Sequence, residues 1–171
     1  MRALLVSCAV LLLTGCTRPQ VYQEVRPAQA MPAAGSDPVV LTVQSMKGET
    51  TFTQAQLESL RIIEYRTARP DDASHPHTYQ GVMIADLMDH LKLTPKKLYM
   101  VATNDYSTFI NAQDVLDYPV MIAFKGDGQP LTIEDKGPLL VVFPSHAYPD
   151  RFNVLEYGSK WVWFLKSIRV E

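Results

Sequence analysis

The chain places two histidines where they could act as metal ligands. His75 and His77 lie two residues apart in a polar loop from residue 68 to residue 78, and two aspartates precede them. Imidazole and carboxylate groups bind metals, but a site needs a third and a fourth ligand, and His146 is a candidate for the third. The same pattern fits exposed loop residues, and we favour that interpretation. We predict no metal site and keep both histidines as candidates for contact with a ligand.

A glycine and basic residues near the C-terminus could together bind an anion. Tyr157 and Gly158 come shortly before Lys160, so a glycine that permits close backbone approach lies beside a positive charge. Arg151 belongs to the loop 145–151, and loops held by a rigid sheet commonly contain binding residues. The alternative for Lys160 is an ordinary solvated side chain. We keep these four residues as candidates for contact with a ligand, and for Lys160 we favour the solvated interpretation.

The sequence predicts no catalytic residue. A serine hydrolase needs a serine, a histidine and an acid within mutual reach. The chain lacks the Gly-x-Ser-x-Gly pattern, and Ser145 and His146 are neighbours that point in different directions on an extended segment. We therefore discard this class of enzyme.

The composition excludes further classes of function. The chain has 171 residues, of which 47% are hydrophobic and 20% charged, as expected for one globular domain. The formal net charge is −2, and no cluster of basic residues predicts binding to nucleic acid. The two cysteines are Cys8 and Cys16, so the chain after Cys16 has no thiol for a disulfide, a nucleophile or a metal site.

The first residues are typical of a targeting segment. Arg2 precedes an apolar run from Ala3 to Leu13 that is too short to span a bilayer as a helix. The ending Leu13-Thr-Gly-Cys16 resembles the bacterial lipoprotein signal, which implies removal of residues 1–15 and acylation of Cys16. The alternative is an ordinary signal peptide with an incidental cysteine. We predict a membrane-anchored protein of the bacterial cell envelope, on the periplasmic face. Residue 17 is Thr and not Asp, which in the lipoprotein sorting pattern resembles a signal for the outer membrane.

Two segments follow the predicted anchor. Residues 16–38 contain several prolines and no apolar periodicity, which predicts a disordered tether with a span of roughly 25 Å. Residues 39–171 read as one α+β domain with a mainly antiparallel or mixed sheet and a few short helices. Thr53 and Gln56 form a predicted capping box at the start of a short helix, 54–60.

Alternating or continuous apolar residues predict strands, and apolar residues at spacings of three and four predict a helix. The predicted strands are 39–45, 61–67, 98–103, 106–110, 119–124, 131–133, 139–143 and 161–170, and the other helices are 84–91 and 112–117. Gly126-Asp-Gly128 predicts a tight reversal. Residues 145–160 are predicted to be a long loop. Trp161 and Trp163 would share one face of the last strand.

Several phrases in this order resemble the molybdopterin-binding domain of the sulfite oxidase family, in its small bacterial periplasmic form. They are Tyr79-Gln-Gly81, Thr103-Asn-Asp-Tyr106, the turn at Gly126, Gly137-Pro-Leu-Leu-Val-Val-Phe-Pro144 and Tyr157-Gly-Ser-Lys160. The resemblance covers residues 39–171 and implies that fold. It also implies that Asn104, Asp105 and Tyr106 border the site, and that residues 157–160 approach the pterin phosphate.

In that family a cysteine thiolate binds molybdenum from the loop that corresponds to residues 68–78 here. This loop contains no cysteine, and Ser74 would be a hard, high-pKa substitute for a soft sulfur ligand. We therefore predict that oxidoreductase chemistry is lost and that no cofactor is bound, although molybdopterin is the group that the resemblance implies.

The sequence thus favours a lipid-anchored, non-catalytic binding module for a small anionic ligand or for a partner such as a membrane receptor. The alternative is a molybdenum-cofactor oxidoreductase that binds molybdopterin without a cysteine ligand. A third hypothesis is a purely structural envelope lipoprotein. Ligand, pathway and oligomeric state do not follow from the sequence.

Overall fold

The structure is a computed structural model that describes residues 21–171. The predicted signal peptide and Cys16, the predicted acylation site, lie outside the described residues. Within residues 21–171, no helix is both long enough and apolar enough to cross a membrane.

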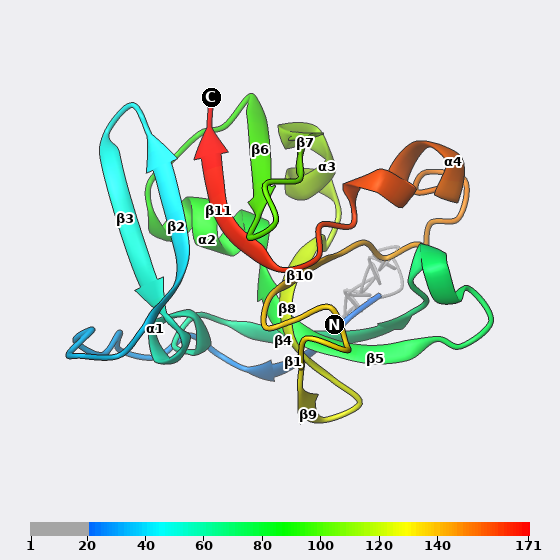
Figure 1. Cartoon of the computed structure of the whole chain (residues 1–171), viewed down its shortest axis with the longest axis horizontal. Helices are drawn as coiled ribbons and strands as arrows, with labels where there is room; N and C mark the ends of the chain where they lie inside the picture. The colour runs from blue at the N-terminus through cyan, green and yellow to red at the C-terminus, as the bar shows by residue number, and fades with distance from the viewer. Residues whose placement is uncertain (1–20) are drawn as a thin grey trace, which may run out of the picture.

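The strands form two sheets, and both are visible in Figure 1. One sheet has the order β1 (Gln23–Arg26), β4 (Ile62–Thr67), β5 (His77–Met83), β8 (Met121–Gly126) and β10 (Leu140–Val142), with β9 (Gln129–Pro130) paired to β8. The other has the order β3 (Gly48–Thr53), β2 (Val39–Ser45), β11 (Leu165–Val170), β6 (Lys97–Ala102) and β7 (Ser107–Asn111). The β2–β11 pair is parallel and the other pairs are antiparallel. The predicted α+β class with a mixed sheet is confirmed.

Short helices connect the strands. They are α1 (Gln54–Glu58), α2 (Ile84–His90), α3 (Ala112–Asp117) and α4 (Val154–Tyr157), with 3-10 turns η1 (Pro70–Asp72) and η2 (Gly158–Lys160). The predicted capping box of α1 is confirmed, because the Thr53 side chain accepts from the Gln56 amide and the Gln56 side chain accepts from the Thr53 amide at 3.0 Å. These bonds satisfy two amides that the first helical turn cannot pair.

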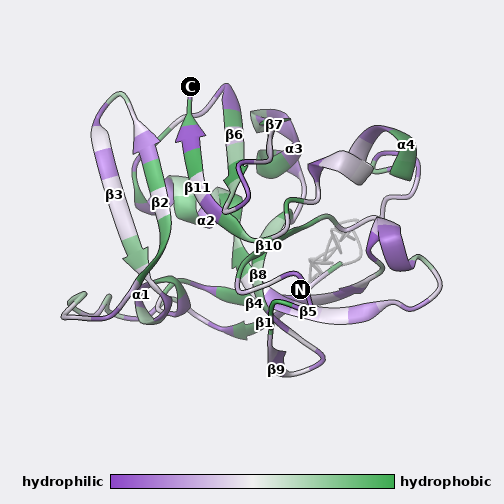
Figure 2. Ribbon diagram, in the orientation of Figure 1, coloured by the Kyte–Doolittle hydropathy of each residue, from purple (hydrophilic) through white to green (hydrophobic). Residues whose placement is uncertain are grey.

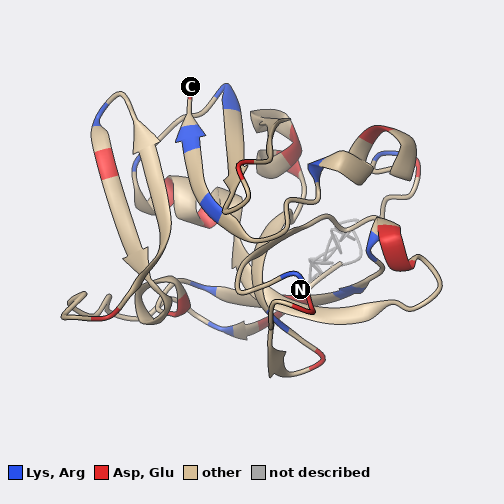
Figure 3. Cartoon of the chain, in the orientation of Figure 1, with Lys and Arg blue, Asp and Glu red and all other residues tan. Residues whose placement is uncertain are grey.

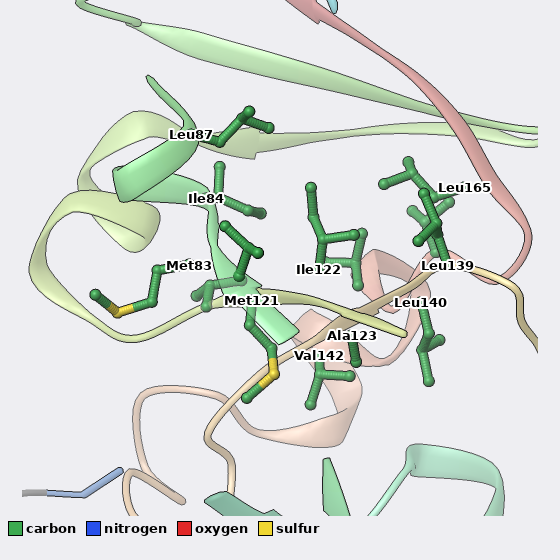
Figure 4. Close-up of a cluster of buried hydrophobic side chains, with 14 of the residues drawn as sticks. Met83, Ile84, Leu87, Met121, Ile122, Ala123, Leu139, Leu140, Val142 and Leu165 are labelled. Atoms are coloured by element: carbon green, nitrogen blue, oxygen red, sulfur yellow. The ribbon is translucent and has the colours of Figure 1, made fainter. Parts of the chain in front are cut away.

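The core lies where the two sheets and α2 meet, and β8 and β10 pass through it. Figure 4 shows Met121, Ile122 and Ala123 packed with Leu140 and Val142, and all five are buried. Gly81 allows β5 and β8 to lie close together, because a Cβ at this position would lie 2.1 Å from the carbonyl oxygen of Ile122. A larger residue at position 81 would therefore push the two strands apart.

The central hairpin differs from its prediction in one strand. The tight reversal after β8 is confirmed, with Asp127 and Gly128 at φ values of 49° and 80°. The predicted strand 131–133 is absent from the described sheets. Thr132 instead bonds through its amide and hydroxyl to the Asp135 carboxylate, at 3.2 and 2.7 Å. The strand that pairs with residues 121–123 of β8 is β10.

The described part of the predicted tether is ordered against the domain, so the prediction was wrong for this segment. Gln23–Arg26 forms β1 on the edge of β4, and the Gln29 amide donates to the Ser59 carbonyl at 2.7 Å. Arg26 also donates to the Glu58 carbonyl. Backbone pairing to an exposed sheet edge needs no apolar periodicity.

The C-terminal region also differs from its prediction. The last strand begins at Leu165, so Trp161 and Trp163 precede it. The prediction that they share one face of this strand was therefore wrong. The predicted loop 145–160 contains α4, whose N-cap Asn153 accepts from the Glu156 amide at 3.0 Å. The sequence reasoning missed this cap.

Candidate functional site

A cleft of about 550 Å³ lies where the loop after β4 faces the segment between β10 and η2. One wall comes from residues 68–73 and the other from residues 145–161. The lining residues are Ala68, Arg69, Pro70, Ala73, Ser145, His146, Pro149, Phe152, Asn153, Val154, Tyr157, Gly158 and Trp161. Most of these side chains are apolar, with a few polar groups among them, which is the usual composition of a small-molecule site.

His146 joins the two walls. Its Nδ1 accepts the Ala68 amide at 3.1 Å. In the neutral ring, Nδ1 is then the acceptor and the proton lies on Nε2, which is left as the donor. Gly158 lies near the first wall: a Cβ there would be 3.8 Å from Pro70, an ordinary van der Waals distance.

Arg69 is the cation of the first wall. Its side chain is only 14% exposed, and Nε donates to Asp71 at 3.1 Å. The Tyr79 hydroxyl next to it is buried and has no hydrogen-bond partner among the described residues. Burial raises the pKa of Tyr79 to about 12, against the opposing effect of the Arg69 charge. Thr67, one residue before the cleft, likewise has a buried hydroxyl without a partner in residues 21–171.

Arg151, in contrast, is paired inside the fold. Its guanidinium donates to the fully buried carboxylate of Asp114 on α3, which also accepts from the Tyr157 hydroxyl at 3.0 Å. The Arg151 guanidinium lies 5.1 Å from the centre of the Tyr157 ring. Burial, with the Asp114 hydrogen bond, raises the pKa of Tyr157 to about 12. Arg151 thus forms a structural ion pair, and its contact with a ligand stays a prediction.

A smaller cleft of about 320 Å³ adjoins the first and shares Gly158 and Trp161 with it. Its other lining residues are Asn104, Tyr106, Ser159 and Trp163. The structure therefore brings four predicted site residues, Asn104, Tyr106, Tyr157 and Gly158, to two neighbouring clefts. The Tyr106 hydroxyl donates to the Ser159 carbonyl at 2.6 Å, and the Asn104 side chain accepts from the Tyr106 amide at 3.2 Å.

Asp105 and Lys160 line neither cleft, and each contacts another side chain of the domain. Asp105 adopts φ 64° in the turn, and its exposed carboxylate pairs with Lys166 at 3.0 Å. The Lys160 ammonium lies 4.1 Å from the centre of the Tyr157 ring and 5.9 Å from that of Phe109. Lys160 is held over aromatic faces by a cation–π contact.

The two histidines of the first polar loop pair with carboxylates. His75 Nδ1 lies 2.6 Å from Asp72, and His77 Nδ1 lies 2.7 Å from Asp127. These contacts lower the pKa of Asp72, chiefly through His75, and that of Asp127, chiefly through His77. Residues 21–171 contain no group of three or more His, Cys, Asp or Glu side chains that could hold a metal ion.

A protein-family model described as the oxidoreductase molybdopterin binding domain matches residues 28–171. The chain belongs to this family. The resemblance seen in the sequence is thereby confirmed. No curated protein matches the chain. Among solved structures, the sulfane dehydrogenase SoxCD from Paracoccus pantotrophus is similar, with a TM-score of 0.60 and 17% identity. The similarity covers 76% of this chain and 37% of that one, and at this identity it shows the fold alone.

The side chains of the cleft do not fit the family's metal centre. A molybdenum–thiolate bond needs a sulfur donor, and the wall that follows β4 contains none. The imidazole of that cleft, His146, already uses Nδ1 for the Ala68 amide. We therefore assign no reaction step to molybdenum in this protein.

Sequence reasoning missed Arg69 and underrated His146 and Trp161. Arg69 looked like one of several polar residues in a proline-containing loop. The signal that could have found it is its position: it follows a buried strand by two residues, in the loop where the family places its metal ligand.

Proposed function

We propose that this protein is a lipid-anchored, non-catalytic binding module of the bacterial cell envelope, and that its larger cleft takes a small anionic ligand. The anchor would be Cys16, as the lipoprotein-like ending at residues 13–16 predicts. The family fold supplies the cleft, and the missing thiolate argues against the family's redox chemistry.

The observation that supports this proposal best is Arg69. Its guanidinium lies in the cleft wall, and Nε donates to the Asp71 carboxylate at 3.1 Å. Among residues 21–171, no other arginine or lysine lines this cleft. Guanidinium matches the planar geometry of carboxylate and phosphate oxygens. The Nε2 proton of His146 provides a second donor in the same cleft.

The second candidate function is a molybdopterin oxidoreductase that holds its cofactor without a cysteine. The family match over residues 28–171 favours it. It differs from the first in its requirement for a bound pterin. A partner protein, such as a membrane receptor, is a further candidate occupant of the cleft.

Titration of the intact protein with inorganic phosphate and with sulfate by calorimetry tests the anion site. We expect Arg69→Gln to weaken binding by about tenfold or more, since a charge-assisted hydrogen bond contributes about 1.5–3 kcal/mol. Lys160→Glu should weaken it less, because Lys160 lies over the Tyr157 ring.

Arg66→Gln is the matched control, since Arg66 is exposed on β4 three residues before Arg69 and its loss changes the net charge equally. Equal effects of the two arginine variants, or no measurable binding of either anion to the unaltered protein, would refute the anion site.

A further inference from the structure

The described chain begins alongside β4, the strand that leads into the larger cleft. β1 and β4 are antiparallel, with Gln23 opposite Glu64. Backwards from Gln23 the chain therefore runs along β4 towards Thr67, and β4 is followed directly by the cleft residue Ala68. In Figure 1 the blue trace that precedes β1 runs towards the side of the molecule where η1 and α4 lie, and residues of η1 and α4 line the cleft.

The chain between this point and the predicted anchor is short. Position 21 is five steps along the chain from position 16. At about 3.6 Å per residue at most, residue 21 can lie no more than about 18 Å from Cys16. This is less than the roughly 25 Å that a free tether of 16–38 would allow. An acylated Cys16 would therefore hold the cleft end of the domain next to the bilayer.

The same end of the molecule presents apolar side chains without cover. On α4, Leu155 is 97% exposed and Val154 is 57% exposed, and Val154 also lines the cleft. Figure 2 shows hydrophobic residues on α4. Ionic groups of both signs lie around α4: Asp150, Glu156 and Lys160, with the charge of Arg151 already paired with Asp114. Figure 3 shows acidic and basic residues mixed in this region.

We propose that α4 and the rim of the larger cleft rest on the membrane surface, with Leu155 and Val154 in the lipid interface, so that the cleft opens at the bilayer. This inference rests on the lipid anchor in the proposed function. Two apolar side chains would bind a membrane weakly by themselves, but a tether of this length makes the contact intramolecular and raises the effective concentration. Because the nearby cations do not outnumber the anions, the contact should gain little from anionic lipid.

The test uses the mature lipidated protein, residues 16–171, in phosphatidylcholine vesicles that contain a nitroxide-labelled lipid. Leu155→Cys and Met46→Cys are each labelled with an environment-sensitive fluorophore, and an acylated Cys16 leaves each variant with one reactive thiol. Met46 is the matched control, fully exposed in the turn between β2 and β3, at the opposite end of the view in Figure 1.

We expect a large loss of fluorescence and a blue shift at position 155 and little change at position 46. A ten-residue Gly-Ser insertion after Thr17 should reduce the quenching at position 155 towards that at position 46. Equal quenching at both positions, or none at 155, in protein that floats with the vesicles would overturn the membrane orientation alone. Protein that does not float with the vesicles would refute both the anchor and this inference.

Discussion

Two arginines near the larger cleft have opposite environments. Arg151 has its charge neutralised inside the fold by the buried carboxylate of Asp114, which also accepts from Tyr157. Arg69 has one hydrogen bond, to an aspartate at the surface, and lies beside a buried hydroxyl without a partner. The first arrangement is complete without a ligand and the second is not. Arg151 therefore stabilises the scaffold of the cleft, and Arg69 is the arginine that we propose to contact a ligand.

The largest expected effect is on the scaffold side. Arg151→Met would leave Asp114 fully buried with Tyr157 as its remaining side-chain partner, so we expect a loss of about 3 kcal/mol in the free energy of unfolding. Urea denaturation measures it. The control is Lys166→Met, which breaks the exposed pair with Asp105 and should change stability by less than about 0.5 kcal/mol. Similar values for both variants would show that Arg151 has no special structural role.

A smaller effect separates two tyrosines that face each other on β4 and β5. Tyr65→Phe removes a buried hydrogen bond to the Val142 carbonyl of 2.9 Å and should cost about 1 kcal/mol. Tyr79→Phe removes a hydroxyl that has no partner among the described residues, so the ligand-free protein should keep its stability or gain slightly. Both are measured by thermal unfolding. A loss at Tyr79 as large as that at Tyr65 would contradict the assignment of an unsatisfied group.

A further effect is a loss of stability at alkaline pH. Burial raises the pKa of Tyr79 from 10.0 to about 12, so the folded protein keeps a proton that the unfolded chain loses. Stability should therefore be fully present below pH 10 and fall as the pH rises towards 12. Tyr79→Phe should reduce this loss, in a comparison of denaturation midpoints at several pH values, while Tyr65 and Tyr157, whose pKa values burial also raises, maintain the rest of it. An unchanged profile would indicate that the hydroxyl is not buried in solution.

The sequence predicts those parts of the fold whose cause is local. Thr53 and Gln56 cap α1 through neighbouring backbone amides, and Asp127-Gly128 makes a turn that few other residues allow. β1 was missed because its polar residues pair with an existing sheet edge, which is a property of the folded domain.

The same limit applies to the site. The pair between Asp114 and Arg151 joins residues 37 positions apart, and the Ala68–His146 bond joins residues 78 apart. Sequence can show that each arginine is charged, but which one meets a buried carboxylate depends on how α3 packs against the loop before α4. Arg151 therefore looked like a ligand contact, and Arg69 did not stand out.

The central claim is that this family member has kept the cleft and lost the metal chemistry. The most direct measurement is the molybdenum and pterin content of the full-length protein, expressed with cofactor synthesis intact and purified without denaturation. Mass spectrometry gives the metal, and fluorescence after oxidation gives the pterin. We expect no stoichiometric molybdenum, and pterin without metal would identify the anionic ligand. Near-stoichiometric molybdenum would contradict the claim and establish an oxidoreductase with an unusual metal ligand.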